Sequence, residues 1–175
     1  YGAIEFYKAC REAGIKPIIG VEMYIAKRSY LDKEGKMDAE PSHLTVLAKN
    51  YQGYLNLIKL TTEAHINGYY YKPRVDKKLL QEFSTGLIAL SGCPSGEFIR
   101  TLQTGNQSKI EELIKSYQEI FGEENFYLEL QNHPYQNSLD QASDEVIKTD
   151  LKRLSVNLYD EIRANPIQIF LFKIS

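Results

Sequence analysis

The sequence predicts an α/β fold, in which strands and helices alternate along the chain. Two observations support this prediction. Segments with the period-two alternation of strands, or with a short apolar run, are followed by segments with the 3.6-residue periodicity of amphipathic helices. Several of the strands are also too apolar to have one face in water, which is typical of a sheet covered on both sides. We therefore expect polar chemistry in the loops that follow these strands.

The first half of the chain predicts two helices, two strands and two polar segments. The helix over 3–13 carries an apolar stripe that includes Cys10, which we interpret as a core residue, and Gly14 ends it. The other expected elements are a strand over 15–26, a surface excursion over 27–41, a strand over 43–48, a helix over 53–66 and an aromatic, basic loop over 68–74.

The second half continues the alternation. Asp76 is expected to cap a short helix that ends at Phe83. Ser108 and Glu111 have the spacing of a capping box, which predicts a helix that starts at Ser108 and ends at Gly122. The remaining predictions are a strand over 86–91 buried on both faces, a helix over 97–102, a strand over 126–131 and a helix over 144–154.

Composition excludes several classes of protein. The 175 residues carry 21 Lys and Arg against 23 Asp and Glu, a net charge of −2, which argues against a broadly basic surface for nucleic acid but permits a local groove.

Cys10 and Cys93 are far apart and form no CxxC, so a disulfide framework or zinc finger is not expected. No long apolar run or secretory signal occurs, and we expect a cytoplasmic protein with no membrane partner.

Glu22 is the first candidate for chemistry. It stands in an apolar strand, where an ionised side chain on a buried face costs several kcal/mol unless it is paired or coordinated. The functional interpretation is a metal ligand or a general acid or base. The alternative is a strand-end carboxylate that reaches solvent or a lysine.

His43 and Cys93 are the other two candidates. A neutral imidazole at His43 can bind zinc, although the start of a plain parallel strand is the wrong end for such a site. Cys93 directly follows a buried strand, where a thiolate can bind a metal or act as a nucleophile. The alternatives are a half-buried histidine bonded to the backbone and a buried, inert cysteine.

Weaker signals come from other segments. Glu129 and His133 flank the end of the last predicted strand and can join a polar cluster, but ordinary strand and loop positions explain them equally well. The loop GYYYKPR over 68–74 mixes aromatic rings and cations, as single-strand binders do, yet a solvated loop anchored by one ring is the simpler interpretation. The motifs GxGxxG, GxxxxGK[ST], HExxH and GxSxG are all absent.

Four strings carry a resemblance to a known family: GAIEFYKACREAGIKPIIGVEMYIA, HLTVLAKNYQGYLNLIKLTTEAHINGYYYKPRVDKKLL, GLIALSGCPSGE and IFGEENFYLELQNH. In order and spacing they resemble the PHP (polymerase and histidinol phosphatase) domain of bacterial replicative DNA polymerase III alpha subunits, from about Tyr1 to His133. The resemblance implies a seven-stranded β/α barrel whose strand ends hold up to three zinc or manganese ions, with phosphoester hydrolysis, including 3′–5′ exonuclease activity, where that site is kept.

The resemblance also implies roles for the three candidates. Glu22 matches a ligand that bridges two ions, His43 matches a ligand of one of them, and Cys93 stands where related phosphoesterases have histidine. The implied partners are DNA and deoxynucleotides, a sliding clamp, a proofreading subunit and a clamp loader, with Mg²⁺ for the polymerase domain. The alternative is a non-catalytic scaffold that stabilises the polymerase and docks the proofreading subunit.

The chain departs from the family pattern at both ends. The family's HxH strand would precede Tyr1, and its last metal-binding strand is replaced by an unrelated sequence. We therefore expect an incomplete barrel over residues 1–154, a divergent tail over 155–175 whose apolar end is either an added strand or a sequence break, and a fragment of a longer polymerase that is inactive alone. The polymerase aspartates are expected outside this chain.

Overall fold

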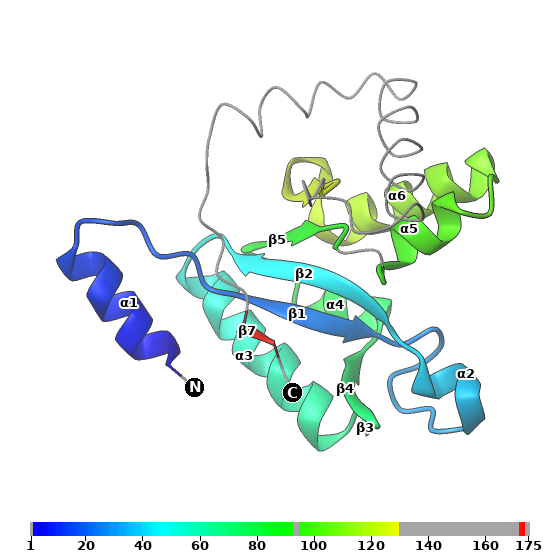
Figure 1. Cartoon of the computed structure of the whole chain (residues 1–175), viewed down its shortest axis with the longest axis horizontal. Helices are drawn as coiled ribbons and strands as arrows, with labels where there is room; N and C mark the ends of the chain where they lie inside the picture. Colours follow the sequence, from blue (N-terminus) through cyan, green and yellow to red (C-terminus); the bar gives the residue numbers. More distant parts are fainter. Residues whose placement is uncertain (1, 93–94, 130–171, 174–175) are drawn as a thin grey trace, which may run out of the picture.

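A mixed sheet organises the computed structural model, which describes residues 2–92, 95–129 and 172–173 (Figure 1). The strand order is β3-β4-β1-β2-β5-β6, and β7 pairs with β1. The strands are β1 (Gly20–Ile25), β2 (Ser42–Ala48), β3 (Tyr69–Tyr70), β4 (Lys72–Val75), β5 (Leu87–Leu90), β6 (Phe126–Tyr127) and β7 (Phe172–Lys173). The helices are α1 (Ala3–Glu12), α2 (Gly35–Ala39), α3 (Tyr51–Ile66), α4 (Lys77–Glu82), α5 (Glu97–Leu102) and α6 (Gln107–Phe121), followed by the 3-10 turn η1 (Glu123–Asn125).

The α/β class is confirmed, but strand directions differ from a parallel sheet. β1 pairs antiparallel with β2, and β2 pairs antiparallel with β5, whereas β1–β4, β5–β6 and β1–β7 are parallel. Within the described residues the sheet is an open path, so the seven-stranded barrel stays a prediction. The short strand β7 falls inside the apolar tail, and it pairs at Val21 and Glu22 of β1.

The two faces of the sheet have different chemistry. One face is apolar and packs against α3, α4, α5 and α6 in a single core cluster. Sheet residues of this core are Met23, Ile25, Leu44, Val46, Leu87 and Ala89. The opposite face carries Glu22, Tyr24, His43 and Thr45, because side chains alternate along β1 and β2. The antiparallel register therefore brings polar groups of two strands together.

Several local predictions are confirmed. Asp76 caps α4, since its Oδ1 accepts a hydrogen bond of 2.8 Å from the Leu79 N–H. The helices over 53–66 and 97–102 are present as α3 and α5, and the strand over 43–48 as β2. The predicted strand over 126–131 is described as a strand only at Phe126–Tyr127, and the helix over 144–154 lies outside the described residues.

Other local predictions are wrong. The cap of α6 is Asn106, whose side chain accepts from the Lys109 N–H, so Ser108 lies inside the helix. The strand β5 buries Leu87 and Ala89 but leaves the alternate residues half-buried. The segment over 68–74 is a hairpin of β3 and β4 rather than a loop. Finally, α1 is amphipathic but has no buried residue and stands apart from the sheet in Figure 1, so Cys10 is half-exposed and not a core residue.

A close backbone contact joins α3 to the start of β5. A Cβ atom on Gly53 would lie 1.8 Å from the Gly86 carbonyl oxygen, and Gly86 itself has φ of 75°. The Lys49 N–H donates to the same Gly86 oxygen at 2.9 Å, and the Asn50 side chain caps α3 by accepting from the Gly53 N–H at 3.0 Å. Only glycine permits this approach at position 53.

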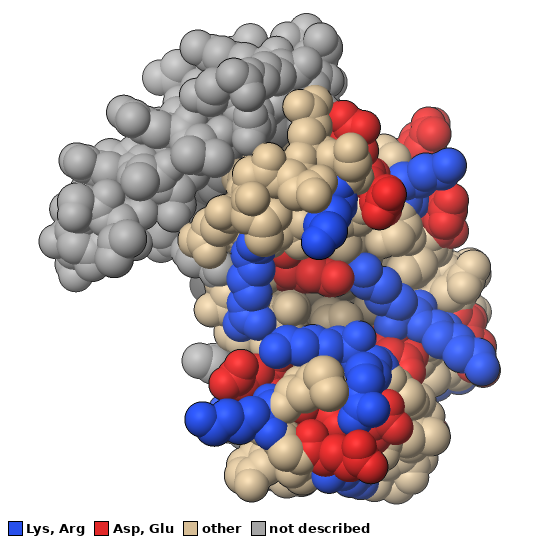
Figure 2. All heavy atoms as spheres, turned by 90° about the vertical axis from the view of Figure 1, so that its right-hand side faces the viewer, with Lys and Arg blue, Asp and Glu red and all other residues tan. Residues whose placement is uncertain are grey.

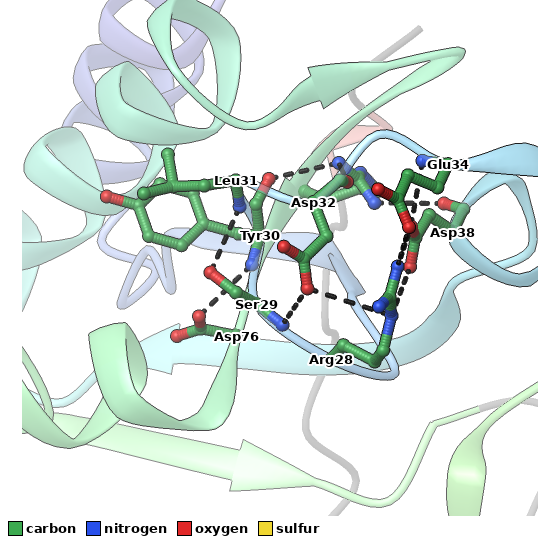
Figure 3. A network of polar contacts seen from close by, with 9 residues as sticks. Arg28, Ser29, Tyr30, Leu31, Asp32, Glu34, Asp38 and Asp76 are labelled. Atoms are coloured by element: carbon green, nitrogen blue, oxygen red, sulfur yellow. Dashed lines mark hydrogen bonds and ion pairs between the residues drawn. The ribbon is translucent and has the colours of Figure 1, made fainter.

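The excursion between β1 and β2 is ordered around a buried carboxylate (Figure 3). Asp38, predicted to lie on the surface, is 1% exposed. It accepts hydrogen bonds from the Arg28 guanidinium at 2.6 and 3.2 Å and from the Glu34 N–H at 2.9 Å. The Arg28 hydrogen bonds, and then the Glu34 N–H, lower the pKa of Asp38 below its ordinary value.

Arg74 of β4 fixes the excursion to the sheet. Its side chain is completely buried and donates to four backbone carbonyls at 2.7–3.1 Å, those of Tyr30, Asp32, Asp38 and Gly68. Burial lowers the pKa of Arg74. Because the buried guanidinium already donates to four carbonyls of the protein, Arg74 cannot contact a nucleic acid. This argues against the interpretation of GYYYKPR as a segment that binds single strands.

We expect Gly53→Ala to destabilise the chain by about 1–3 kcal/mol, because the new methyl group meets a backbone carbonyl that cannot move without breaking the α3–β5 junction. In an open helix the same change stabilises by about 1 kcal/mol, so the sign of the effect is diagnostic. Urea unfolding measures it, and an unchanged or raised stability would contradict the close approach.

We expect the contribution of Asp38 to stability to depend on pH. Its pKa is lower in the folded than in the unfolded chain, so the stabilisation is fully present above the unfolded value of about 3.9 and is lost as the pH falls through the folded value. Asp38→Asn should therefore destabilise at neutral pH, and the difference from wild type should shrink below about pH 4. Urea unfolding across this range tests it, with Glu40→Gln, an exposed carboxylate 3.8 Å from Lys27, as the control. A pH-independent difference would refute the assignment.

Candidate functional site

Glu22 and His43 form a close polar pair on the face of the sheet opposite the main core. Glu22 Oε1 lies 2.7 Å from His43 Nδ1, and the two side chains are 20% and 22% exposed. In the register of β1 and β2, Tyr24 pairs with His43 and Glu22 with Thr45, so the two residues are diagonal neighbours on one face. The sequence named both residues separately, and the structure brings them together.

The antiparallel direction of β2 removes the difficulty raised for His43. At the start of a parallel strand the histidine would lie at the end of the sheet away from the end of β1. Because β2 runs against β1, the start of β2 lies beside the end of β1. His43 is thus correctly placed for a site at the carboxyl end of β1, and this end is the one that α/β sheets commonly use for chemistry.

Tyr24 holds the imidazole from the side. Its ring makes an edge contact with the His43 ring, with centroids 5.1 Å apart at 85°, and it is 4% exposed. The Lys72 ammonium lies 5.5 Å from the centre of the Tyr24 ring. Tyr24 was not singled out in the sequence, although the alternation of β1 places it on the same face as Glu22.

Cys93 lies outside the described residues, but the residues around it border His43. The His43 N–H donates to the Ser95 carbonyl at 3.2 Å, and His43 forms a bridge with Gly96. Gly92 has φ of 81°, and a Cβ atom there would lie 3.2 Å from the His43 carbonyl oxygen. Gly92 and Ser95 therefore both lie beside the backbone of the histidine.

Glu129 lies beyond β6, next to the end of β5. Its backbone N–H donates to the Ser91 hydroxyl at 2.8 Å, and its carboxylate is partly buried. Beyond Tyr127, which pairs with Leu90, the period of two assigns Glu129 to the same face as Thr45. His133, its predicted companion, lies outside the described residues.

The donor set fits a divalent ion in chemistry but is incomplete in number. A carboxylate and an imidazole are ordinary zinc ligands, and a hydrogen bond between such groups is common where a histidine binds metal. Among residues 2–92, 95–129 and 172–173, no group of three His, Cys, Asp or Glu side chains is close enough to hold a metal. A tetrahedral ion needs about four donors, so Glu22 and His43 supply part of a site.

In the same described part of the chain, none of the helices has the length and apolar character that a membrane span requires.

Comparison with known proteins gives the ancestry of this arrangement. A family model described as the PHP domain matches residues 1–133. Proteins named DNA polymerase III subunit alpha are similar to the chain: 44% identical in Treponema pallidum and 45% in Borreliella burgdorferi, each over 134 residues and 76% of the chain, and 42% in Thermus aquaticus over 149 residues and 83% of the chain. The chain spans 12% of the length of each of these relatives. With the family model covering most of its length, the chain belongs to the PHP domain family.

Proposed function

We propose that the chain is the PHP part of a replicative DNA polymerase III alpha subunit, and that Glu22, His43 and Cys93 are ligands of a divalent metal centre for phosphoester hydrolysis. The observation that carries the proposal is the 2.7 Å contact between Glu22 Oε1 and His43 Nδ1. It supports a site because two polar side chains from different strands converge on one face of the sheet, in a chain that is 42–45% identical to such polymerase subunits.

The contact between Glu22 and His43 suggests a role for each side chain in metal binding. In the proposed site, a neutral His43 with its proton on Nδ1 would donate a hydrogen bond to Glu22 Oε1 across the 2.7 Å contact, which leaves the Nε2 lone pair for a metal. The edge contact with Tyr24 restrains rotation of the ring. A bound ion would polarise a phosphoryl oxygen and lower the pKa of its water ligand. Glu22 would then serve as a second donor or as the group that orients His43.

Further parts of the proposal concern the parent polymerase. Zinc or manganese suits the Glu, His and Cys donors, while Mg²⁺ suits a polymerase domain with carboxylate ligands. We propose 3′–5′ exonuclease activity for an intact centre, a cytoplasmic location, and contacts with DNA, deoxynucleotides, a sliding clamp, a proofreading subunit and a clamp loader. We also propose the division into a PHP part over 1–154 and a divergent tail over 155–175, for which the family match to residue 133 gives partial support.

Metal binding provides the test. Glu22→Ala and His43→Ala should each lower bound zinc by about tenfold or more, because each removes a donor or its orienting partner. Calorimetry with zinc alone measures the affinity. His65→Ala is the matched control, since His65 is exposed on α3 and its Nδ1 lies 2.8 Å from the Thr61 carbonyl oxygen of the same helix. Cys93→Ser should also weaken binding, whereas Cys10→Ser should not.

The outcomes separate two roles for the domain. Unchanged zinc binding in Glu22→Ala and His43→Ala would overturn the ligand assignment and favour a scaffold that docks the proofreading subunit. A loss in these variants alone, with the His65→Ala control intact, supports a metal centre.

We expect the 175-residue chain by itself to show no zinc-stimulated 3′–5′ exonuclease activity. Glu22, His43 and Cys93 supply too few donors for the multinuclear centre that phosphoester hydrolysis uses in this family. Release of labelled nucleotides from single-stranded DNA, with and without zinc, measures the activity. Zinc-dependent release that disappears in Glu22→Ala would show the expectation of inactivity to be wrong.

A further inference from the structure

A hollow of about 430 Å³, lined mostly by charged residues, opens at the edge of the sheet where β1 ends. Its wall comes from four segments: the end of β1 and the chain after it, the start of β2, the start of α4, and α5 with the start of α6. Charged residues dominate the lining, with five cations and one carboxylate: Lys27, Arg28, Lys77, Arg100, Lys109 and Glu97. Figure 2 shows Lys and Arg side chains gathered around a hollow in the middle of this face, with an acidic side chain among them.

The hollow and the Glu22–His43 pair use opposite faces of the same two strands. Ile25 and Ser42 line the hollow and pair with each other across β1 and β2. The next pair along the ladder is Tyr24 with His43, whose side chains point to the other face. The basic hollow is therefore a separate feature and does not rest on the proposed metal centre.

The one carboxylate of the hollow is already neutralised. Glu97 accepts from the Lys77 ammonium at 3.1 Å and from the Tyr117 hydroxyl at 2.8 Å. Burial raises the pKa of Tyr117 well above its ordinary value, so the hydroxyl stays protonated and keeps donating. Lys77 also lies 4.7 Å from the centre of the Tyr117 ring. Because its charge is balanced by Lys77 and its position is held by Tyr117, Glu97 should repel a bound anion only weakly.

Arg100 and Lys109 differ from the other cations. Arg28 is paired with Asp38 and Glu34, and Lys27 lies 3.8 Å from Glu40. Neither Arg100 nor Lys109 has an ion pair or side-chain hydrogen bond with any residue that the structure describes. Two exposed cations from successive helices thus converge on one concave surface, and neither has a carboxylate partner in the described ranges 2–92, 95–129 and 172–173.

We propose that this hollow binds phosphate groups, carried by a DNA strand or by a free nucleotide, through Arg100 and Lys109. A phosphate presents several acceptor oxygens and matches the planar fork of arginine, so it can engage cations that arrive from different segments. Ile25 and Ala26 are the only apolar residues among those that line the hollow, whereas a docked peptide usually needs apolar pockets for its anchor residues. These features favour a phosphate over an acidic peptide.

The test uses the whole chain with a chelator present, and labelled short single-stranded DNA as the probe in fluorescence anisotropy. Arg100→Gln with Lys109→Gln should weaken binding roughly tenfold or more, because charge-assisted hydrogen bonds are lost. The slope of log affinity against log salt should fall by about 1.4 for two lost single-strand phosphate contacts. Arg100→Lys with Lys109→Arg should keep most of the affinity.

Lys78→Gln with Lys115→Gln is the matched control, since it removes the same charge from exposed positions of α4 and α6 outside the hollow. An equal loss in this control, no DNA binding by the wild type, or tighter binding of polyglutamate than of DNA would each overturn the proposal. If inorganic pyrophosphate displaces the labelled DNA, the hollow binds free phosphate groups. If pyrophosphate does not displace DNA that is bound, the hollow is specific for a DNA strand.

Discussion

The antiparallel register between β1 and β2 is the constraint on which the rest of the molecule depends. Side chains alternate between the faces with a period of two, so a slip of one residue would carry Glu22 and His43 into the apolar core and expose Met23 and Leu44. The burial of the core face therefore fixes the polar face as well. The same register places Ile25 and Ser42 at the rim of the basic hollow. Both candidate sites follow from a single pairing, which the hydrophobic pattern enforces.

Arg74 shows how a charged group can serve the fold. A buried guanidinium without a carboxylate in direct contact is costly, but here every donor group meets a backbone carbonyl of the excursion or of the β3–β4 hairpin. These carbonyls have few other donors, since the excursion has only the short helix α2. Arg74 thus replaces regular structure for the segment between β1 and β2, and this segment ends at Ser42 and His43. The position of the histidine depends on it.

The sequence was sufficient for the class of fold, and it singled out Glu22 and His43, which the structure brings together; their role as metal ligands stays a prediction. Apolar periodicity located α3, α6 and β2, and an ionisable residue in an apolar strand marked Glu22. Strand direction was not predictable, since an antiparallel β2 and a parallel one have the same alternation. The buried Asp38 and Arg74 were also missed: in a polar segment they look like solvated charges, and only the fold supplies their partners. The basic hollow has no sequence signal at all, because its cations come from three segments that are far apart in the sequence.

A net charge of −2 is compatible with a site for a polyanion, because some cations are neutralised by nearby carboxylates and others are not. Three of the five cations of the hollow are paired: Lys27 and Arg28 with carboxylates of the excursion, and Lys77 with Glu97 of α5. Such pairs hold the wall in shape and contribute little long-range field. The attraction for an anion then comes from Arg100 and Lys109, whose effect acts over a short range in salt. The attraction of this surface for an anion should therefore be local and limited to a few phosphate contacts.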